Sequence, residues 1–442
     1  MARGEAAPPV ADEPATRAGS ARRHPHLPHL EWRPGSARRP SGSLLVRSAD
    51  LRRITVAFVV STSSDQFTLV ALLWYVLQVT NSPLALSAVV LANRVPASLS
   101  APAVGRLLDR LSPVKLMVAH SLARAAFLLV IPVLHAVGLT SLLGIMLPAF
   151  CLGLLAPLTD VGVRVVIPRL VPLRELTAAN GILAIGEQFP FLVGPALGGV
   201  FVGVLGANAL LLPALGSVLV ARLLRKVGDG STVPAGAPPA TQSDETLGTS
   251  GFKLLVRNPA VRALLLLTFA YFFAYGPLEP ALPLYARDHL HAGGGGYGAL
   301  WSAVGAGAIA GLVLVKPLSR LRPGIVNAAG AIGWGVLLVP LPWVHSLTPA
   351  LVVLFFAGVV WAPYIAIEAS VIQQLMPPAT HGTVFGARRS AMVLASPSGA
   401  AVGGAMLRHL PADMVILASG LACVAAGAAC LAAKSVRAVT AP

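Results

Sequence analysis

The chain has 442 residues, of which 55% are hydrophobic and only 11% are charged, and its mean hydropathy is +0.76. Soluble domains carry about 25% charged residues, so this composition excludes an ordinary soluble protein and indicates a polytopic membrane protein. The formal net charge is +16, but the basic residues lie in short connections between apolar segments, so we expect a lipid bilayer and no nucleic acid as partner.

The first 50 residues contain no apolar run and predict a disordered, basic cytoplasmic tail. Each span of a bilayer needs about 20 apolar residues, and the rest of the chain supplies twelve such stretches. Their ranges are 54–79, 83–107, 114–138, 141–166, 176–204, 207–224, 260–285, 296–316, 324–344, 349–374, 384–407 and 413–433. We therefore predict an all-α membrane protein with a six-helix bundle at 51–225, a linker at 226–258, a second bundle at 259–435 and a C-terminal tail at 436–442.

Lys and Arg residues alternate between the two sides of the predicted membrane. The tail, the linker and every second loop are basic, whereas the opposite loops contribute little more than Arg287 and Arg408. The positive-inside rule then places both termini and the linker in the cytoplasm, in a plasma (inner) membrane of bacterial type. On the opposite side, the glycines at 293–296 predict a flexible external loop.

The predicted fifth span contains a glycine-rich stretch, GILAIGEQFPFLVGPALGG, at 181–199. Its small residues have the spacing of helix–helix contacts, and Pro195 removes a backbone donor and is expected to bend the helix. The same pattern returns 205 positions later, where Gly386, Gly399, Gly403 and Gly404 match the glycines of the first copy listed here: Gly181, Gly194, Gly198 and Gly199. A repeat of half the chain length predicts two bundles with the same plan.

A short basic connection, GRLLDRLSPVKLM, lies at 105–117 between the second and third spans. So short a turn between two helices indicates that this connection acts as a hinge or latch. The alternative is that it is a solvated loop that anchors the helix ends. In the second half, the matching connection carries Ser319 where the first has Asp109, so a charge latch would be asymmetric.

This connection resembles the signature of the major facilitator superfamily at Gly105, Leu107, Asp109 and Arg110, although Ser112 replaces the second glycine. The stretch at 181–199 resembles the fifth-helix motif of that superfamily's antiporters. It matches at Gly181, Gly194, Pro195, Gly198 and Gly199, and it has Pro190 where a glycine is usual. Runs at 63–86, 168–180, 297–314 and 373–386 are similar to the drug–proton antiporter branch that includes macrolide-efflux proteins and the enterobactin exporter.

The resemblance implies a fold of twelve helices in two pseudo-symmetric bundles, which move about a midplane cavity by alternating access. It also implies that Gly105, Asp109 and Arg110 form a gating loop and that the fifth helix packs against the other bundle. By the same analogy, the fifth-helix motif favours export over uptake.

Charged residues inside the spans are candidates for proton coupling or substrate contact, since an ionisable group in a membrane needs a partner or water. Asp65 and Arg94 lie mid-span in antiparallel neighbours and are expected to meet, either as a coupling pair or as a fixed structural pair. Glu187 has no obvious cation nearby. Asp160 with Arg164 is interpreted as a structural pair, or as the partner of the loop with Asp109 and Arg110. The remaining candidates are Glu279, Glu368 and Arg124.

Aromatic residues of the spans could line an apolar pocket or face lipid, and we select Tyr271, Tyr275 and Tyr364 because they share segments with the carboxylates. The three cysteines lie in apolar segments without a CxxC or Cys/His pattern, so we expect no metal and no cofactor. No residue pattern favours an enzyme.

The sequence as a whole predicts a monomeric, proton-driven exporter of a small amphiphilic molecule, such as a drug, an antibiotic, a siderophore or another metabolite. Proton-coupled uptake and a non-transporting receptor or scaffold remain the alternatives.

Overall fold

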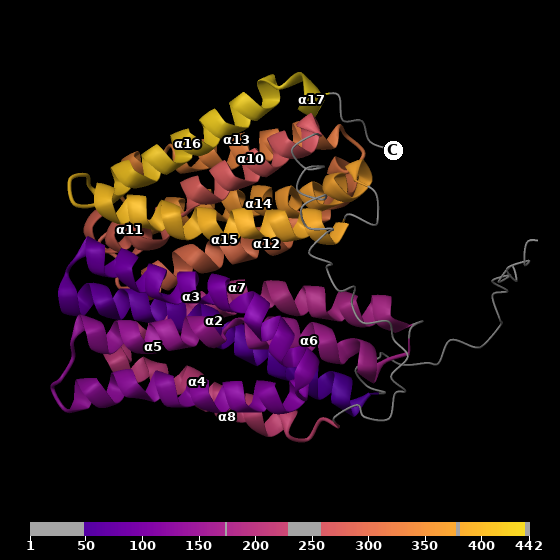
Figure 1. Ribbon diagram of the computed structural model, residues 1–442. Coiled ribbons are helices and arrows are strands. Elements are labelled where there is room, and N and C mark those ends of the chain that lie inside the picture. The colour runs from indigo at the N-terminus through magenta and orange to yellow at the C-terminus, as the bar shows by residue number, and fades with distance from the viewer. Residues whose placement is uncertain (1–47, 173–174, 229–257, 377–380, 438–442) are drawn as a thin grey trace, which may run out of the picture. The chain divides into compact units, whose positions relative to one another are not determined.

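The computed structural model describes residues 48–172, 175–228, 258–376 and 381–437. Within these ranges the chain is helical and contains no strand. Figure 1 shows the helices lying alongside one another. The predictions for residues 1–47 of the tail, for most of the linker and for the end of the C-terminal tail lie outside the described residues.

The N-terminal bundle, as we name α2–α8, contains the first six spans. Its helices are α2 (Ala49–Thr80), α3 (Pro83–Arg110), α4 (Pro113–Ala136), α5 (Leu142–Leu155), α6 (Pro157–Leu170), α7 (Leu176–Leu205) and α8 (Leu211–Leu224), with a 3-10 turn η2 (Gly206–Leu210). Helices α5 and α6 together form the fourth span.

The C-terminal bundle, α10–α16, contains the other six. Its elements are α10 (Pro259–Tyr275), α11 (Leu278–Leu284), the π-helical turn η3 (Tyr285–His289), α12 (Gly294–Leu318), α13 (Pro323–Leu338), the 3-10 turn η4 (Leu341–Trp343), α14 (Leu347–Leu375), α15 (His381–Met406) and α16 (Ala412–Ala432). A short helix, α17 (Lys434–Arg437), follows. Helices α10 and α11 together form the seventh span. Ten stretches of the described residues are long and apolar enough to cross a membrane; one of them, Ala178–Leu224, contains both α7 and α8, and a shorter apolar helix lies at Met392–Met406 within α15. This arrangement agrees with the predicted fold of twelve helices.

Local sequence sets where many helices begin. Ser and Asn side chains accept hydrogen bonds from the free N–H groups of the first turn, and proline at the first position has no N–H to satisfy. The capping residues are Ser48, Ser82, Ser112, Ser141 and Asn258, and proline follows directly at the start of α3, α4 and α10.

Two predicted spans are interrupted by proline. Pro157 and Pro277 each lack the N–H that would bond the carbonyl four residues earlier. A new helix begins at each of these points: α6 begins at Pro157, and α11 begins directly after Pro277. By contrast, α7 is helical without interruption through Pro190 and Pro195, and the bend predicted at Pro195 stays a prediction.

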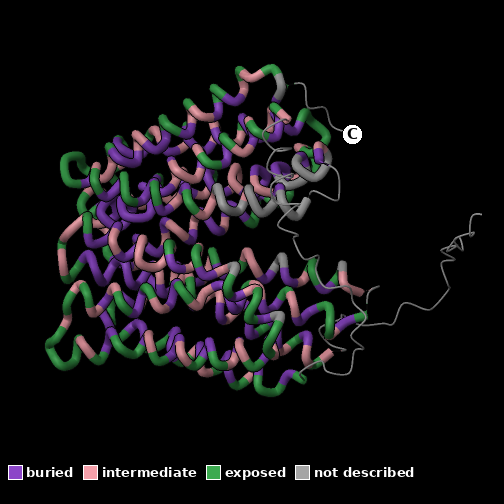
Figure 2. The backbone as a smooth tube through the Cα atoms, in the orientation of Figure 1, coloured by how far each residue is buried: buried purple, intermediate pink, exposed green. Residues whose placement is uncertain are grey.

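Buried and exposed residues alternate along single helices in Figure 2. In α16, Val415, Cys423 and Cys430 are buried, and so is the polar Ser419, whereas the apolar Leu421 is exposed. Lipid tails accept such a surface as readily as a protein core does, so burial here reports helix packing rather than polarity.

The repeat in the sequence is a repeat of packing. A Cβ at Gly194 or Gly198 would collide with Ser63, Gln66 or Phe67 of α2, and their counterparts Gly399 and Gly403 meet α10 and Pro277 in the same way. The equivalent helices α7 and α15 therefore pack on the equivalent helices α2 and α10.

The last glycine of each copy makes a contact between the bundles. A Cβ at Gly199 would lie 2.7 Å from the Cα of Gly298 on α12, and one at Gly404 would lie 2.5 Å from the Cβ of Ser87 on α3. The expectation that the fifth helix packs against the other bundle is thus confirmed, and α15 does the same.

The predicted external loop at 293–296 is wrong in part. Gly294 opens α12, and a Cβ there would lie 2.7 Å from the Gly199 carbonyl oxygen and 3.0 Å from Trp74 Nε1. Glycine is needed at this point for the close approach of α12 to α7, not for flexibility.

Candidate functional site

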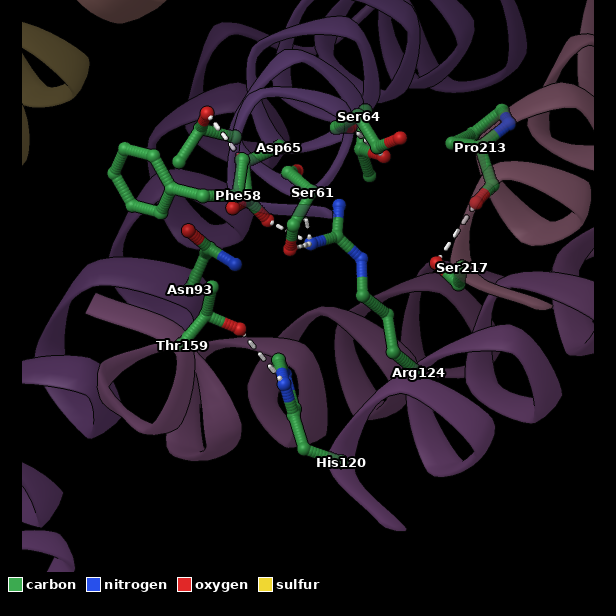
Figure 3. Close-up of polar contacts among 12 residues, drawn as sticks. Phe58, Ser61, Ser64, Asp65, Asn93, His120, Arg124, Thr159, Pro213 and Ser217 are labelled. Carbon is green, nitrogen blue, oxygen red and sulfur yellow. Dashed lines mark hydrogen bonds and ion pairs between the residues drawn. The ribbon is translucent and has the colours of Figure 1, made fainter. Parts of the chain in front are cut away.

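Asp65 on α2 and Arg124 on α4 form an ion pair inside the N-terminal bundle. Asp65 Oδ1 lies 2.5 Å from Arg124 Nη1, and the side chains are 47% and 4% exposed, respectively. Arg124 also donates to the carbonyl and hydroxyl oxygens of Ser61 at 3.3 and 3.4 Å. Figure 3 shows the guanidinium pointing toward Ser61 and Asp65. The cation is thus fixed in the bundle, whereas its carboxylate remains accessible.

The sequence predicted that Asp65 would meet Arg94, and this is wrong. Arg94 on α3 instead reaches α11 of the other bundle, where its Nη2 donates to Glu279 Oε1 at 3.0 Å. The side chains are 40% and 3% exposed. The helix break at Pro277 places Glu279 in the first turn of α11, where the helix dipole favours a negative charge.

Glu187 has a cation after all, since Arg164 on α6 donates to its Oε1. The pair links α6 to α7 within the N-terminal bundle, and the Arg164 side chain is 62% exposed. The interpretation of Arg164 as the structural partner of Asp160 missed this contact, because Glu187 lies on the next span.

Glu368 on α14 is completely buried in the C-terminal bundle. Its Oε2 accepts from Arg388 Nη2 on α15 at 2.6 Å, and its Oε1 contacts the hydroxyl of Thr268 on α10. Each of the four candidate carboxylates therefore pairs with an arginine. In three of the pairs both residues belong to the same bundle, whereas Arg94–Glu279 joins the two bundles.

The three selected tyrosines belong to one aromatic cluster of the C-terminal bundle. Tyr271 and Tyr364 stack with ring centroids 4.7 Å apart, and both are buried in this structure. That they line an apolar pocket stays a prediction. Tyr275 is half-buried and packs against Trp301 and Trp334. These rings stabilise the bundle from within.

The predicted gating loop is mostly helix. Gly105, Asp109 and Arg110 lie in the last turns of α3, and Ser112 caps α4 by accepting from the Lys115 N–H at 3.4 Å. Arg110 is exposed, and a Cβ at Gly105 would meet no atom within 4 Å. The latch role of this loop stays a prediction, and the side chain of Asp109 lies outside the description.

Sequence reasoning missed four polar residues of these clusters: His120, Thr159, Thr268 and Arg388. His120 is buried one turn before Arg124, and its Nδ1 lies 3.0 Å from Thr159 Oγ1 of α6 (Figure 3). Arg388 lies near the start of α15 and pairs with Glu368 of α14. The sequence carries no signal for this pair, because it joins two helices whose relative rotation depends on packing.

Within the described ranges, no group of three or more His, Cys, Asp or Glu residues is arranged to hold a metal ion.

Comparisons with known proteins agree with this architecture. Residues 54–400 match the family model of the Major Facilitator Superfamily. The multidrug efflux pump Tap of Mycolicibacterium fortuitum is 25% identical over 79% of this chain and 87% of its own. The macrolide efflux protein A of Streptococcus pyogenes is 25% identical over 50% of this chain and 55% of its own.

A solved structure of a bacterial homologue of the iron transporter ferroportin, in an inward-facing state, has the same fold. Its TM-score is 0.67 at 18% identity, covering 88% of this chain and 99% of that one. The resemblance to the efflux branch, noted from the sequence, is confirmed by the two relatives. The chain belongs to the major facilitator superfamily of multi-pass membrane transporters.

Proposed function

We propose that this transporter exports small amphiphilic molecules in exchange for protons, by alternating access. Export is supported by the two efflux relatives and by the glycine-rich α7, the helix whose motif resembles that of antiporters. A small-molecule substrate, protons and lipid would be its only partners, and a monomer would suffice.

The observation that carries the alternating-access proposal is where the bundles touch. Helix α8 ends and helix α10 begins at the same end of the helix bundles, and we name this end the linker end. We name the opposite end the far end. The Gly199–Gly298 and Ser87–Gly404 contacts belong to the far halves of their helices, and the Arg94–Glu279 pair crosses between the bundles near mid-span. Separating these contacts opens the far end.

By the positive-inside rule, the basic loops favour a linker end that faces the cytoplasm. In that orientation the far end faces outside, and this structure corresponds to a transporter closed to the outside. We propose Asp65, which is exposed, and Glu187, which is half-buried, for proton or substrate binding, because each is held by an arginine that remains in its own bundle.

Export is tested by producing the protein in efflux-deficient bacteria. We expect these cells to accumulate less ethidium than cells with an empty vector, and a protonophore to abolish the difference. A panel of antibiotics that includes a macrolide then bounds the substrate class. If no compound moves and proteoliposomes show no proton flux, the receptor or scaffold alternative is supported; inward, proton-driven accumulation of a solute supports uptake.

The second prediction concerns the pair between the bundles. Arg94→Gln leaves the buried Glu279 carboxylate without its cation, which costs about 2–5 kcal/mol in comparable buried pairs. Glu279→Gln leaves Arg94, which is 40% exposed, and should cost less. We therefore expect the closed far end to open more often. Ser87→Cys, buried between α3 and α15, reports this as faster labelling by an external maleimide.

The charge-swapped variant Arg94→Glu with Glu279→Arg is the matched control and should restore slow labelling. Each variant is compared with its own parent lacking Ser87→Cys, to subtract labelling of the native cysteines. Unchanged labelling in both single variants would contradict a gating role for this pair.

A further inference from the structure

A groove of about 490 Å³ lies between the start of α4 and the end of α8, on the surface of the N-terminal bundle. Its apolar walls include Val118, Ala119 and Leu122 of α4, Leu224 at the end of α8, and Val227 just after it. Leu224 and Val227 are buried and form the floor, whereas Ala119 and Leu122 are exposed. The groove is therefore apolar and open along α4.

The groove opens on a side of the N-terminal bundle that meets lipid. Helices α4 and α8 pack on each other and on helices of their own bundle, and Figure 1 shows both at the edge of that bundle, away from the C-terminal bundle. Exposed apolar side chains continue from the groove along α4 at Leu122, Leu129 and Val133 and along α8 at Leu219 and Leu215. In a membrane, this apolar surface is in contact with acyl chains.

Two basic side chains from different helices line the groove at the linker end. Lys115 lies in the first turn of α4 and Arg225 directly follows α8, and both are exposed. Leu122 lies seven residues after Lys115, which is about 10 Å along the helix at 1.5 Å per residue. The groove thus has positive charge at the membrane surface and apolar walls toward the hydrocarbon.

The carboxylate that borders this region is already engaged. Asp50 of α2 pairs with Arg53 at 2.8 Å, and its Oδ2 accepts from the Gly228 N–H at 3.4 Å. Arg222 and Lys226 add two further exposed positive charges at this end of α8. Among the described residues around the groove, positive charge therefore exceeds negative charge.

We propose that this groove binds an anionic phospholipid of the leaflet at the linker end. Its phosphate would accept hydrogen bonds from Lys115 and Arg225, and the first part of an acyl chain would lie against Ala119 and Leu122. Charge-assisted hydrogen bonds from Lys and Arg to phosphate oxygens are strong, and basic pockets between membrane helices bind anionic head groups in this way. A zwitterionic lipid also has a phosphate, but its cationic amine would be repelled by the same side chains.

The proposed lipid site goes beyond the proposed export and does not depend on it. Every residue that lines the groove belongs to α4, to α8 or to the residues directly after α8, all on the N-terminal bundle. The groove should therefore be present in both states of an alternating-access cycle, and lipid binding can be measured without transport.

Native mass spectrometry of the full chain in a neutral detergent measures lipid binding directly. We expect a one-to-one complex with phosphatidylglycerol and at least roughly tenfold weaker binding of phosphatidylcholine. Each basic residue near an anionic membrane surface contributes about fivefold in affinity, so Lys115→Gln with Arg225→Gln should weaken phosphatidylglycerol binding roughly thirtyfold. The matched control is Lys316→Gln with Arg320→Gln, which removes two exposed charges at the linker end of the C-terminal bundle. It should bind like the parent protein.

Ala119→Leu separates the shape of the groove from its charge. The larger side chain fills the groove and leaves Lys115 and Arg225 in place, and an apolar residue exposed to lipid is tolerated there. We expect phosphatidylglycerol binding to weaken roughly tenfold, since part of the acyl chain loses its contact. Glycerol phosphate, which has no acyl chain, should not displace the lipid from the parent protein.

Three results would overturn the proposal. The first is equal binding of the two lipids, or unchanged phosphatidylglycerol binding in both groove variants. The second is displacement of the lipid by an equal concentration of glycerol phosphate, which would indicate a site for free phosphate. The third is a loss of thermal stability in Ala119→Leu when the parent protein binds no lipid, which would indicate that another part of the chain fills the groove.

Discussion

Asp65→Asn is expected to abolish ethidium export driven by a proton gradient. The substitution removes the exposed carboxylate that we propose for proton uptake, and it leaves the buried Arg124 with neutral hydrogen-bond partners and no negative one. Removing one partner of a buried ion pair costs about 3–5 kcal/mol, which is an upper bound here because Asp65 is 47% exposed. Efflux assays in proteoliposomes and thermal unfolding in detergent measure the two effects separately.

Arg124→Gln is the matched variant and should destabilise the protein less than Asp65→Asn does. It leaves a carboxylate that water can still solvate, whereas Asp65→Asn leaves a buried cation. The double variant is therefore expected to recover stability without recovering proton coupling. Normal gradient-driven export by both Asp65→Asn and Glu187→Gln would show that the proton sites are assigned to the wrong residues.

Gly199→Ala is expected to stop transport by keeping the far ends of the bundles apart. The new Cβ would lie 2.7 Å from both the Cα and the N of Gly298, and these backbone atoms can move only with the whole of α12. In a free helix, alanine is about 1 kcal/mol more favourable than glycine, so any loss must come from the contact between bundles. Ethidium efflux and maleimide labelling of Ser87→Cys measure the result.

Gly203→Ala provides the control one turn along the same helix. A Cβ there would lie 3.7 Å from Gly294, which is an ordinary van der Waals distance. We expect this variant to transport like the parent protein. If Gly199→Ala does as well, the contact between α7 and α12 is not a constraint on transport.

The glycine-rich stretch shows how far the sequence could go. Its spacing predicted a tightly packed helix, and its echo predicted a second helix with the same role, because close helix packing requires small residues at fixed intervals. Which helices it packs on could not be read from that pattern. The structure assigns Gly194 and Gly198 to α2, and Gly199 to α12 of the other bundle.

The charged residues show where the sequence stopped. Asp65, Arg94, Glu187, Glu279 and Glu368 were selected because each lies within an apolar span, where an ion is costly. Their partners were assigned wrongly or not at all, since pairing depends on the rotation and depth of helices that are distant in the chain. Arg94 and Glu279 are separated by 185 residues and lie in different bundles.

The sequence by itself determined the membrane class, the twelve spans and the two-fold plan. The membrane class, the spans and the two-fold plan follow from local rules. In lipid a helix must satisfy its backbone hydrogen bonds within its own segment, so each spanning segment can be recognised by its apolar composition. Tertiary structure alone decided which charges pair, which tyrosines are buried and which glycines join the bundles. Those contacts join helices that are distant in the chain, and how two such helices are placed relative to each other cannot be read from the sequence of either one alone.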